Sequence, residues 1–290
     1  MDFYLQAVQL ALCLGTMCMG IFISMKIFNI PDITTDGSYT LGATVSAVLL
    51  THHMPLAAVI SLSMIMGALA GTLTALVHTK LKIDALLAGI LVMTGLYSVN
   101  LEILGRSNVP LIGTASVFEK FAFFHGDLYN SLAVALLIAA VAAALLAFIL
   151  RTDFGIAMRA TGSNEHMTRA QGVNNNRMKV MGLAMANALT ALSGSLVAQN
   201  QGFADINMGI GIVITGLGAV LIAGALQNWL RIRGMGAQLV LVIAGSLVFQ
   251  LVLAVALLSG VDPSLLKLVT ALLVLLIVAL PRVAALRQHS

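Results

Sequence analysis

Hydrophobic residues occupy long, nearly uninterrupted stretches of this chain, and short polar segments separate them. A helix needs about 20 apolar residues to cross the hydrocarbon core of a bilayer. About nine stretches approach that length, so the pattern predicts about nine membrane-spanning helices. The stretches cover residues 4–26, 32–52, 55–78, 83–104, 128–150, 178–200, 206–228, 236–258 and 264–281.

One polar segment is much longer than the others. Residues 151–179 join the fifth and sixth stretches and include "RATGSNEHMTRAQGVNNNRMK", which is basic and rich in Asn. Ser163 or Asn164 can cap a short helix, and Gly172 suits its C-terminal end. We therefore expect a short helix across the membrane surface, with residues 174–179 only leading the chain back to the bilayer. The alternative is a solvated linker, although far fewer residues could connect two spans.

The composition supports a membrane protein. Of the 290 residues, 60% are hydrophobic and only 9% are charged, and the mean hydropathy is +1.02. A soluble domain of this size would need a polar surface that these residues cannot supply. We expect an all-α polytopic membrane protein, with residues 1–290 forming one transmembrane domain. The net charge of +4 indicates contact with lipid headgroups and no nucleic-acid partner.

The positions of Lys and Arg predict the orientation. If the spans alternate, Arg106, Lys120 and Lys267 lie on one side and twelve basic residues on the other. Because basic loops face the cytoplasm, we expect the N-terminus outside and the C-terminus inside. The twelve are Lys26, Lys80, Lys82, Arg151, Arg159, Arg169, Arg177, Lys179, Arg231, Arg233, Arg282 and Arg287.

An odd number of spans permits two halves with inverted topology, which is a common plan in transporters. The first half would be residues 4–104, the linking helix 128–150 and the second half 178–281, a 4+1+4 arrangement. A faint sequence echo between "PDITTDGSYTLGA" (31–43) and "ADINMGIGIVITGLGA" (204–219) favours this division.

Polar side chains at membrane depth are few, and such side chains face the bundle interior or a cavity. Pro31 and Gly37 interrupt a hydrophobic run, which predicts a discontinuous helix that lines a permeation path. The alternative is an ordinary loop, with Asp36 or Ser38 capping the next helix. The candidates for the path are Asp36, Tyr39, Asn100, Asn187 and Gln201. Interhelical hydrogen bonding is the alternative role for Asn187.

Small residues recur at helical spacing in two spans. Gly67 and Gly71 form a GxxxG pair in the third, and Gly182 and Gly194 belong to a row of small residues in the sixth. Such rows let helix backbones approach closely. The row in the sixth span predicts that this helix lies in the middle of the bundle.

The sequence carries no pattern for catalysis or metal binding. It has no HExxH motif, no Cys/His pairing, no nucleophile elbow and no pair of carboxylates at catalytic spacing. It also lacks a GxxxxGKS or GxxxxGKT motif, so we expect no ATP bound through a P-loop. We expect no enzyme activity, no metal and no cofactor in this chain.

Residues 157–199, "AMRATGSNEHMTRAQGVNNNRMKVMGLAMANALTALSGSLVAQ", resemble the central motif of permease subunits of ATP-binding-cassette (ABC) importers. The likeness is to the ribose and branched-chain amino acid permease family. The matching residues are Gly162, Asn164, Ala170, Gly172, Val173, Ser193 and Gly194. Residues 30–43 resemble the second helix of a subgroup that works with substrate-binding lipoproteins or periplasmic proteins.

The resemblance implies a permease of the bacterial inner membrane that carries a small organic solute. A separate ATPase would bind ATP and Mg, a binding protein would deliver the solute, and a second permease copy would complete the pore as a homodimer, or as a heterodimer. The short cytoplasmic helix would be the coupling helix that docks the ATPase. Its residues would be Gly162, Ser163, Asn164, Glu165, His166, Met167, Arg169, Ala170 and Gly172.

The sequence indicates the substrate and the energy source less closely than it indicates the fold. No basic cluster lies at membrane depth, which disfavours strong anions and suits amino acids or neutral solutes. The subgroup resemblance favours amino acids, including aromatic ones. The alternative function is a secondary transporter or channel of inverted-repeat type, because Asp36 and Glu102 could serve a proton relay.

Overall fold

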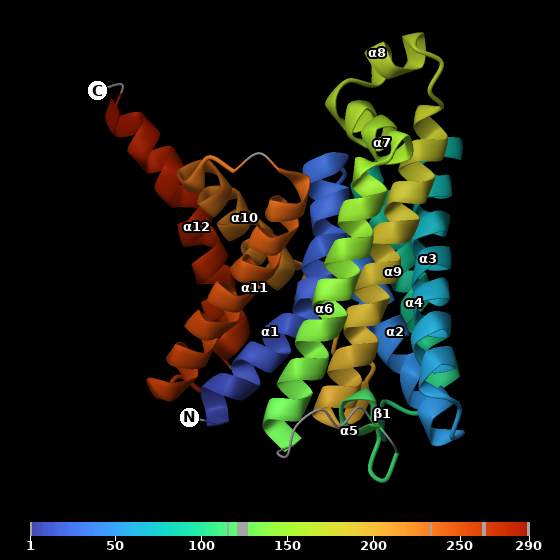
Figure 1. The fold of residues 1–290 in the computed structure, drawn as a ribbon. Helices are drawn as coiled ribbons and strands as arrows, with labels where there is room; N and C mark the ends of the chain where they lie inside the picture. The colour runs from blue at the N-terminus through green and yellow to red at the C-terminus, as the bar shows by residue number, and fades with distance from the viewer. Residues whose placement is uncertain (1, 115, 121–126, 233, 263–264, 289–290) are drawn as a thin grey trace.

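A computed structural model describes residues 2–114, 116–120, 127–232, 234–262 and 265–288, and nearly all of them are helical (Figure 1). The elements are α1 (Asp2–Ile21), its continuation as the π-helix η1 (Phe22–Ile27), α2 (Thr34–Thr51), α3 (Leu56–Lys80), α4 (Ala85–Leu104), β1 (Asn108–Pro110), α5 (Val117–Lys120), α6 (Asp127–Arg151), α7 (Asp153–Ser163), α8 (Glu165–Ala170), α9 (Asn175–Gln201), β2 (Phe203–Asp205), α10 (Ile212–Leu230), α11 (Met235–Leu258) and α12 (Leu266–Gln288).

Each of the nine predicted stretches contains a helix, and seven helices in the described part of the chain are long and apolar enough to cross a membrane. These are α1 with η1, α3, α4, α6, α9, α10 and α11. The other two are α2, which is rich in Ser and Thr and almost wholly buried, and α12, whose apolar part is Leu266–Ala279. The all-α polytopic fold is confirmed, and the number of crossings stays a prediction.

Two predicted boundaries need correction. Residues 206–211 form a turn, and α10 begins only at Ile212, because the preceding chain pairs as β2 with β1 in an antiparallel ladder. Conversely, α9 begins at Asn175, three residues before the predicted start at residue 178. The Asn174 Oδ1 accepts a hydrogen bond from the Arg177 N–H (3.1 Å), which caps the helix there.

Helix α9 lies in the middle of the bundle, as the row of small residues predicted, and it packs against α1, α2 and α3. The four predicted packing glycines all lie at close contacts. A Cβ at Gly67 or Gly71 would come within 2.5 Å of a carbonyl oxygen of α9, and a Cβ at Gly194 within 1.9 Å of the Tyr39 carbonyl of α2. Gly182 faces the ring of Phe28.

The two predicted halves make matching helix contacts. The first helices, α1 and α9, run in opposite directions (Figure 1). The third helix of each half packs on the first helix of the other half, which places α3 on α9 and α11 on α1. The second helix contacts the third and fourth of its own half, as α2 does with α3 and α4, and α10 with α11 and α12. These matching contacts are consistent with an inverted repeat, and the division into two halves stays a prediction.

The sequence echo corresponds to a shared local structure. The Asp32 carboxylate accepts a hydrogen bond from the Thr34 N–H (3.0 Å), and the Asp205 carboxylate accepts one from the Asn207 N–H (2.8 Å). Each turn follows the first helix of its half and precedes the second. The repeated Asp-Ile dipeptide therefore marks the same kind of turn in both halves.

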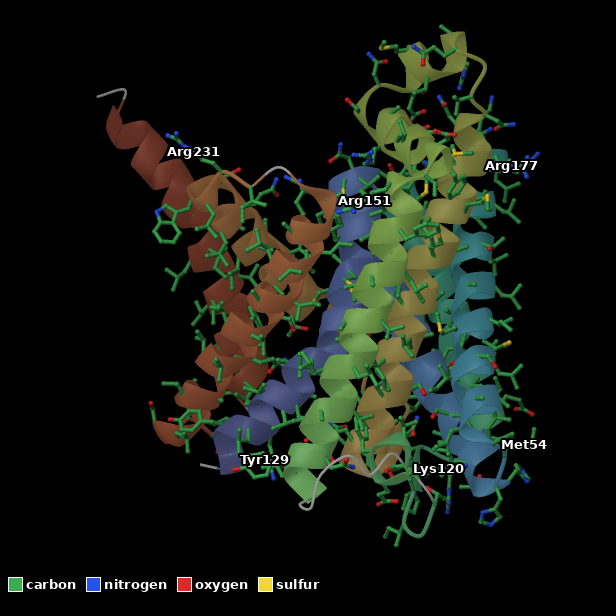
Figure 2. The ribbon with its side chains drawn as sticks, in the orientation of Figure 1. Met54, Lys120, Tyr129, Arg151, Arg177 and Arg231 are labelled. Carbon is green, nitrogen blue, oxygen red and sulfur yellow. The ribbon has the colours of Figure 1, made fainter. Side chains whose placement is uncertain are left out.

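More basic residues lie at one end of the bundle than at the other. Arg151, Arg177 and Arg231 lie at the end that carries α7 and α8, whereas Lys120 and Met54 lie at the opposite end (Figure 2). We call these the cytoplasmic end and the outer end, following the excess of Lys and Arg at the former.

Candidate functional site

Helices α7 and α8 project from the cytoplasmic end of the bundle (Figure 1). The hydroxyl of Thr152 accepts a hydrogen bond from the Gly155 N–H (3.4 Å) at the start of α7. Near the end of α7, a Cβ at Gly162 would lie only 1.7 Å from the Ile27 carbonyl oxygen. Because this space accepts no side chain, α7 packs directly on the last turn of η1.

The predicted short helix is present as α8. The Asn164 Oδ1 accepts hydrogen bonds from the backbone N–H groups of His166 (3.1 Å) and Met167 (3.0 Å), so Asn164 is the cap. The helix ends before Gly172, whose φ of +83° is the left-handed conformation that glycine adopts most easily. Both ends of α8 were therefore correctly predicted.

The start of α9 holds α8 in place, which corrects the interpretation of residues 174–179 as a simple lead back to the bilayer. The buried Asn175 donates to the Glu165 carbonyl (2.6 Å) and accepts from the Thr168 hydroxyl (3.0 Å). Lys179 forms an ion pair with Glu165 (2.5 Å). The run of three Asn residues was a signal for such side-chain to backbone bonds.

The structure brings the predicted coupling residues together on the projection formed by α7 and α8, which we call the coupling projection. Gly162 and Gly172 shape the backbone, and Asn164 and Glu165 hold α8 in place, as described above. The side chains of Ser163, His166, Met167, Arg169 and Ala170 are exposed. Met167 is 60% exposed at the cytoplasmic end, where a large apolar side chain suits contact with another protein. Docking of an ATPase here stays a prediction.

A second polar centre lies where the chain breaks between η1 and α2. The break covers residues 28–33, and Gly37 lies inside α2, so Gly37 does not interrupt the helix as predicted. Asp32 is buried in the break. Its Oδ1 accepts the Thr34 N–H described above, and its Oδ2 accepts a hydrogen bond from the Asn187 side-chain amide of α9 (2.7 Å). The sequence did not single out Asp32 as a site residue.

Asp36 connects the second helices of the two halves. Its Oδ2 accepts the Gly211 N–H (2.8 Å) and its Oδ1 accepts the Val213 N–H (2.9 Å), both at the start of α10. Gly211 has no side chain to cap α10, so Asp36 supplies the cap from 175 residues away. The alternative in which Asp36 or Ser38 caps α2 is wrong, since α2 begins earlier, at Thr34.

The other pathway candidates divide into two groups. Tyr39, Asn100 and Asn187 are buried between helices, and Asn100 donates to the Gly37 carbonyl (3.2 Å). The contacts of Asn187 favour the interhelical hydrogen bond over solute contact. Gln201 lines a cavity of about 680 Å³ at the outer end. As pathway residues, all five candidates stay predictions.

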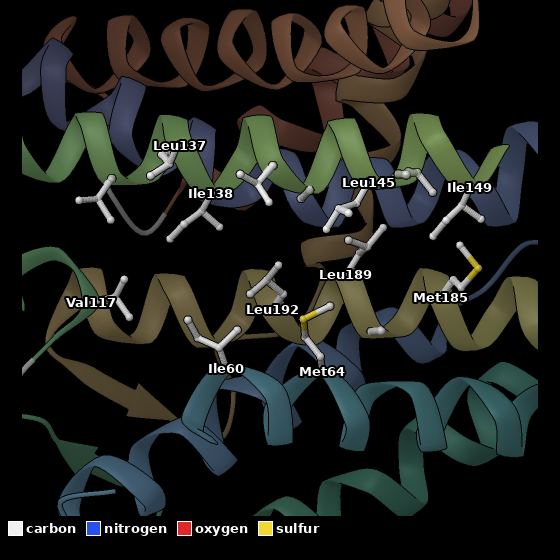
Figure 3. Close-up of a pocket in the computed structure, with 15 residues that line it drawn as sticks. Ile60, Met64, Val117, Leu137, Ile138, Leu145, Ile149, Met185, Leu189 and Leu192 are labelled. Carbon is white, nitrogen blue, oxygen red and sulfur yellow. The ribbon is translucent and has the colours of Figure 1, made fainter. Parts of the chain in front are cut away.

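Two cavities differ sharply in chemistry. The outer cavity is walled by the amide side chains of Gln6, Gln9, Asn200, Gln201 and Gln250, and none of its lining residues is charged. A groove of about 500 Å³ between α6, α3 and α9 is lined by aliphatic and Met side chains alone (Figure 3). The groove offers no side chain that could recognise a polar solute, whereas the outer cavity offers several.

Comparison with known proteins shows the family. The family described as "Branched-chain amino acid transport system / permease component" matches residues 3–279, and the chain belongs to it. The "Tyrosine transport system permease protein" of Clostridioides difficile (strain R20291) is 36% identical over 93% of this chain and 88% of that protein. "Uncharacterized protein RP368" of Rickettsia prowazekii (strain Madrid E) is 32% identical over 93% and 94%. "Ribose import permease protein RbsC" of Haemophilus influenzae (strain ATCC 51907 / DSM 11121 / KW20 / Rd) is 24% identical over 74% and 67%.

The chain is therefore a transmembrane permease subunit of an ABC transporter, and a multi-pass protein of the bacterial inner membrane. The family resemblance predicted from residues 157–199 is confirmed. Family membership also sets aside the alternative of a secondary transporter or channel.

Proposed function

We propose that this permease imports an amino acid that a binding protein delivers from outside, and that a separate ATPase, docked on α8, supplies the energy by hydrolysing ATP with Mg. The arrangement of α7 and α8 is the observation that carries the proposal. A projection with an exposed apolar tip stands at the cytoplasmic end and is fastened to η1 and to α9. A nucleotide-driven movement of the ATPase would pass through these contacts to the two halves. Two copies of the chain, or this chain with a second permease, would form the pore.

Replacing Met167 with Asp is expected to lower the amount of ATPase that co-purifies with the permease. Met167 is exposed at the tip of the projection, so the substitution places a charge at the proposed contact and leaves the fold intact. A central contact residue is worth about 2 kcal/mol, which corresponds to about thirtyfold in Kd. Met54→Asp is the matched control, because Met54 is 43% exposed at the outer end. Equal co-purification of both variants would contradict docking on α8.

An amino acid fits the outer cavity, where amides and apolar side chains surround the space and no charged residue lines it. The name of the C. difficile relative points to tyrosine as the first solute to test. We expect vesicles with permease, ATPase and binding protein to take up labelled tyrosine, and unlabelled aromatic amino acids to compete with it. Uptake of labelled ribose, with none of labelled tyrosine, would show that the substrate class is wrong while leaving the ATPase assignment intact.

A further inference from the structure

An amphipathic cavity of about 460 Å³ lies at the cytoplasmic end, between η1, α10, α11 and α12. This size falls in the range of small-molecule sites, roughly 300–1,000 Å³. Most of its wall is apolar, and its polar groups are Lys26, Gln227, Asn228 and Gln238. It is distinct from the outer cavity and from the coupling projection. The apolar part of the wall is formed by Phe22, Met25, Leu217, Val220, Leu221, Ala223, Gly224, Ala225, Val242, Ile277 and Val278.

The cavity has a single kind of charge. Lys26 is exposed and forms no ion pair with any described residue, and none of the residues that line the cavity is acidic. Lys26 directly precedes Ile27, on whose carbonyl α7 packs, so the ammonium group lies near the cytoplasmic surface of the bundle. A basic group at this level, with apolar walls beside it, suits an anionic headgroup attached to an acyl chain.

The backbone at Lys26 is unusual. Residues 22–27 form a π-helix, in which the Phe28 N–H bonds to the Ile23 carbonyl (3.2 Å), five residues back. Such turns are rare and occur often at functional sites. Phe22, Met25 and Lys26 all belong to this turn and all line the cavity. The π-helix thus contributes both apolar wall and cation to the same space.

We propose that this cavity binds an anionic phospholipid, with the phosphate at Lys26 and the amide groups of α10 and α11, and an acyl chain along the apolar wall. The space beside Gly224 is open, since a Cβ there would meet no atom within 4 Å. The lipid would fill this space and join η1, which supports α7, to helices of the second half. A bound lipid would therefore stabilise the position of η1, on which α7 of the coupling projection packs.

Trp229 can serve as a fluorescent probe of lipid binding, because it is the single tryptophan of the chain. It follows Asn228, which lines the cavity, and is 80% exposed. Full-length permease in vesicles would be titrated with brominated phosphatidylglycerol or brominated phosphatidylcholine, and quenching of Trp229 fluorescence would be measured. We expect tighter binding of the anionic lipid. Lys26→Gln should lower the preference for the anionic lipid about fivefold, since one basic residue is worth about 1 kcal/mol at an anionic surface. Lys80→Gln, at an exposed lysine outside the cavity, should leave it unchanged.

A second variant blocks the cavity without removing charge. Gly224→Leu fills the open space and should also reduce the preference for phosphatidylglycerol, whereas Gly95→Leu, in equally open space on α4, should not. Unchanged preference in both Lys26→Gln and Gly224→Leu would overturn the proposal. Equal quenching of Trp229 by the two brominated lipids in the wild type would also overturn it, because the cavity would then not select an anionic headgroup.

Discussion

Replacing Gly194 with Leu is expected to prevent the permease from folding. Helices α2 and α9 touch through their backbones at this point. A Cβ at Gly194 would lie 1.9 Å from the Tyr39 carbonyl oxygen, and a Cβ at Gly42 would lie 1.9 Å from the Ala191 carbonyl oxygen. Because backbone atoms block both positions, no side-chain rotation relieves the clash. The cost should exceed the ~1–3 kcal/mol of ordinary overpacking, since α2 and α9 must separate.

The measurement is the amount of monodisperse protein extracted from membranes, together with its thermal midpoint in detergent. Gly95→Leu is again the matched control, because it introduces the same side chain into open space on α4. We expect Gly95→Leu to behave as the wild type does and Gly194→Leu to yield almost no monodisperse protein. Equal yields would mean that the close approach of α2 and α9 is not required for folding.

The position of α9 could be predicted from the sequence because close backbone contact requires small residues, and these recur along one helix. The spans could be predicted for a similar reason, since the bilayer demands about 20 apolar residues in each helix. The cap of α8 was also predictable, because Asn164 and the N–H groups that it binds are neighbours in the chain. In each case the physical cause lies within one segment of sequence.

The errors concern contacts between distant segments. The alternative in which Asp36 caps its own helix rested on a local rule, whereas its partners are 175 and 177 residues away in the chain. Asn175 and Lys179 were overlooked in the same way, because only the folded chain brings the start of α9 against Glu165. Sequence pattern reveals which groups need a partner, and it does not reveal which helix supplies one.

These long-range contacts connect the coupling projection to the membrane helices. Helix α7 packs on the end of η1 through Gly162, and α8 is tied to α9 through Asn175. Helix α9 is in turn bonded at Asn187 to Asp32, four residues before Asp36. A displacement of α8 would therefore reach α2 and, through Asp36, α10. Because these contacts join the two predicted halves, they would make the helices of one chain respond to α8 as a single rigid body.

Replacing Asp36 with Ala is expected to abolish transport and to lower the thermal midpoint markedly. The substitution leaves the partly buried N–H groups of Gly211 and Val213 without their acceptor. An unsatisfied buried group costs about 1–3 kcal/mol, which is the upper range for each of these partly buried groups, and the start of α10 also loses the negative charge at its positive end. The packing of Gly209 would remain, because it is against the backbone carbonyl of residue 36, which the substitution does not change.

Three variants distinguish this cap from a general need for an acidic residue. Asp36→Asn keeps the size but offers only one acceptor oxygen for two N–H donors, so its midpoint should lie between those of Asp36→Ala and the wild type. Asp205→Ala is the matched control, since the Asp205 carboxylate also accepts a backbone N–H, from Asn207 two residues away in its own turn near the surface. That loss should cost no more than an ordinary helix cap, about 0.5–2 kcal/mol. If Asp36→Ala lowered the midpoint no further than Asp205→Ala, the bond between α2 and α10 could not be what holds the two halves in register.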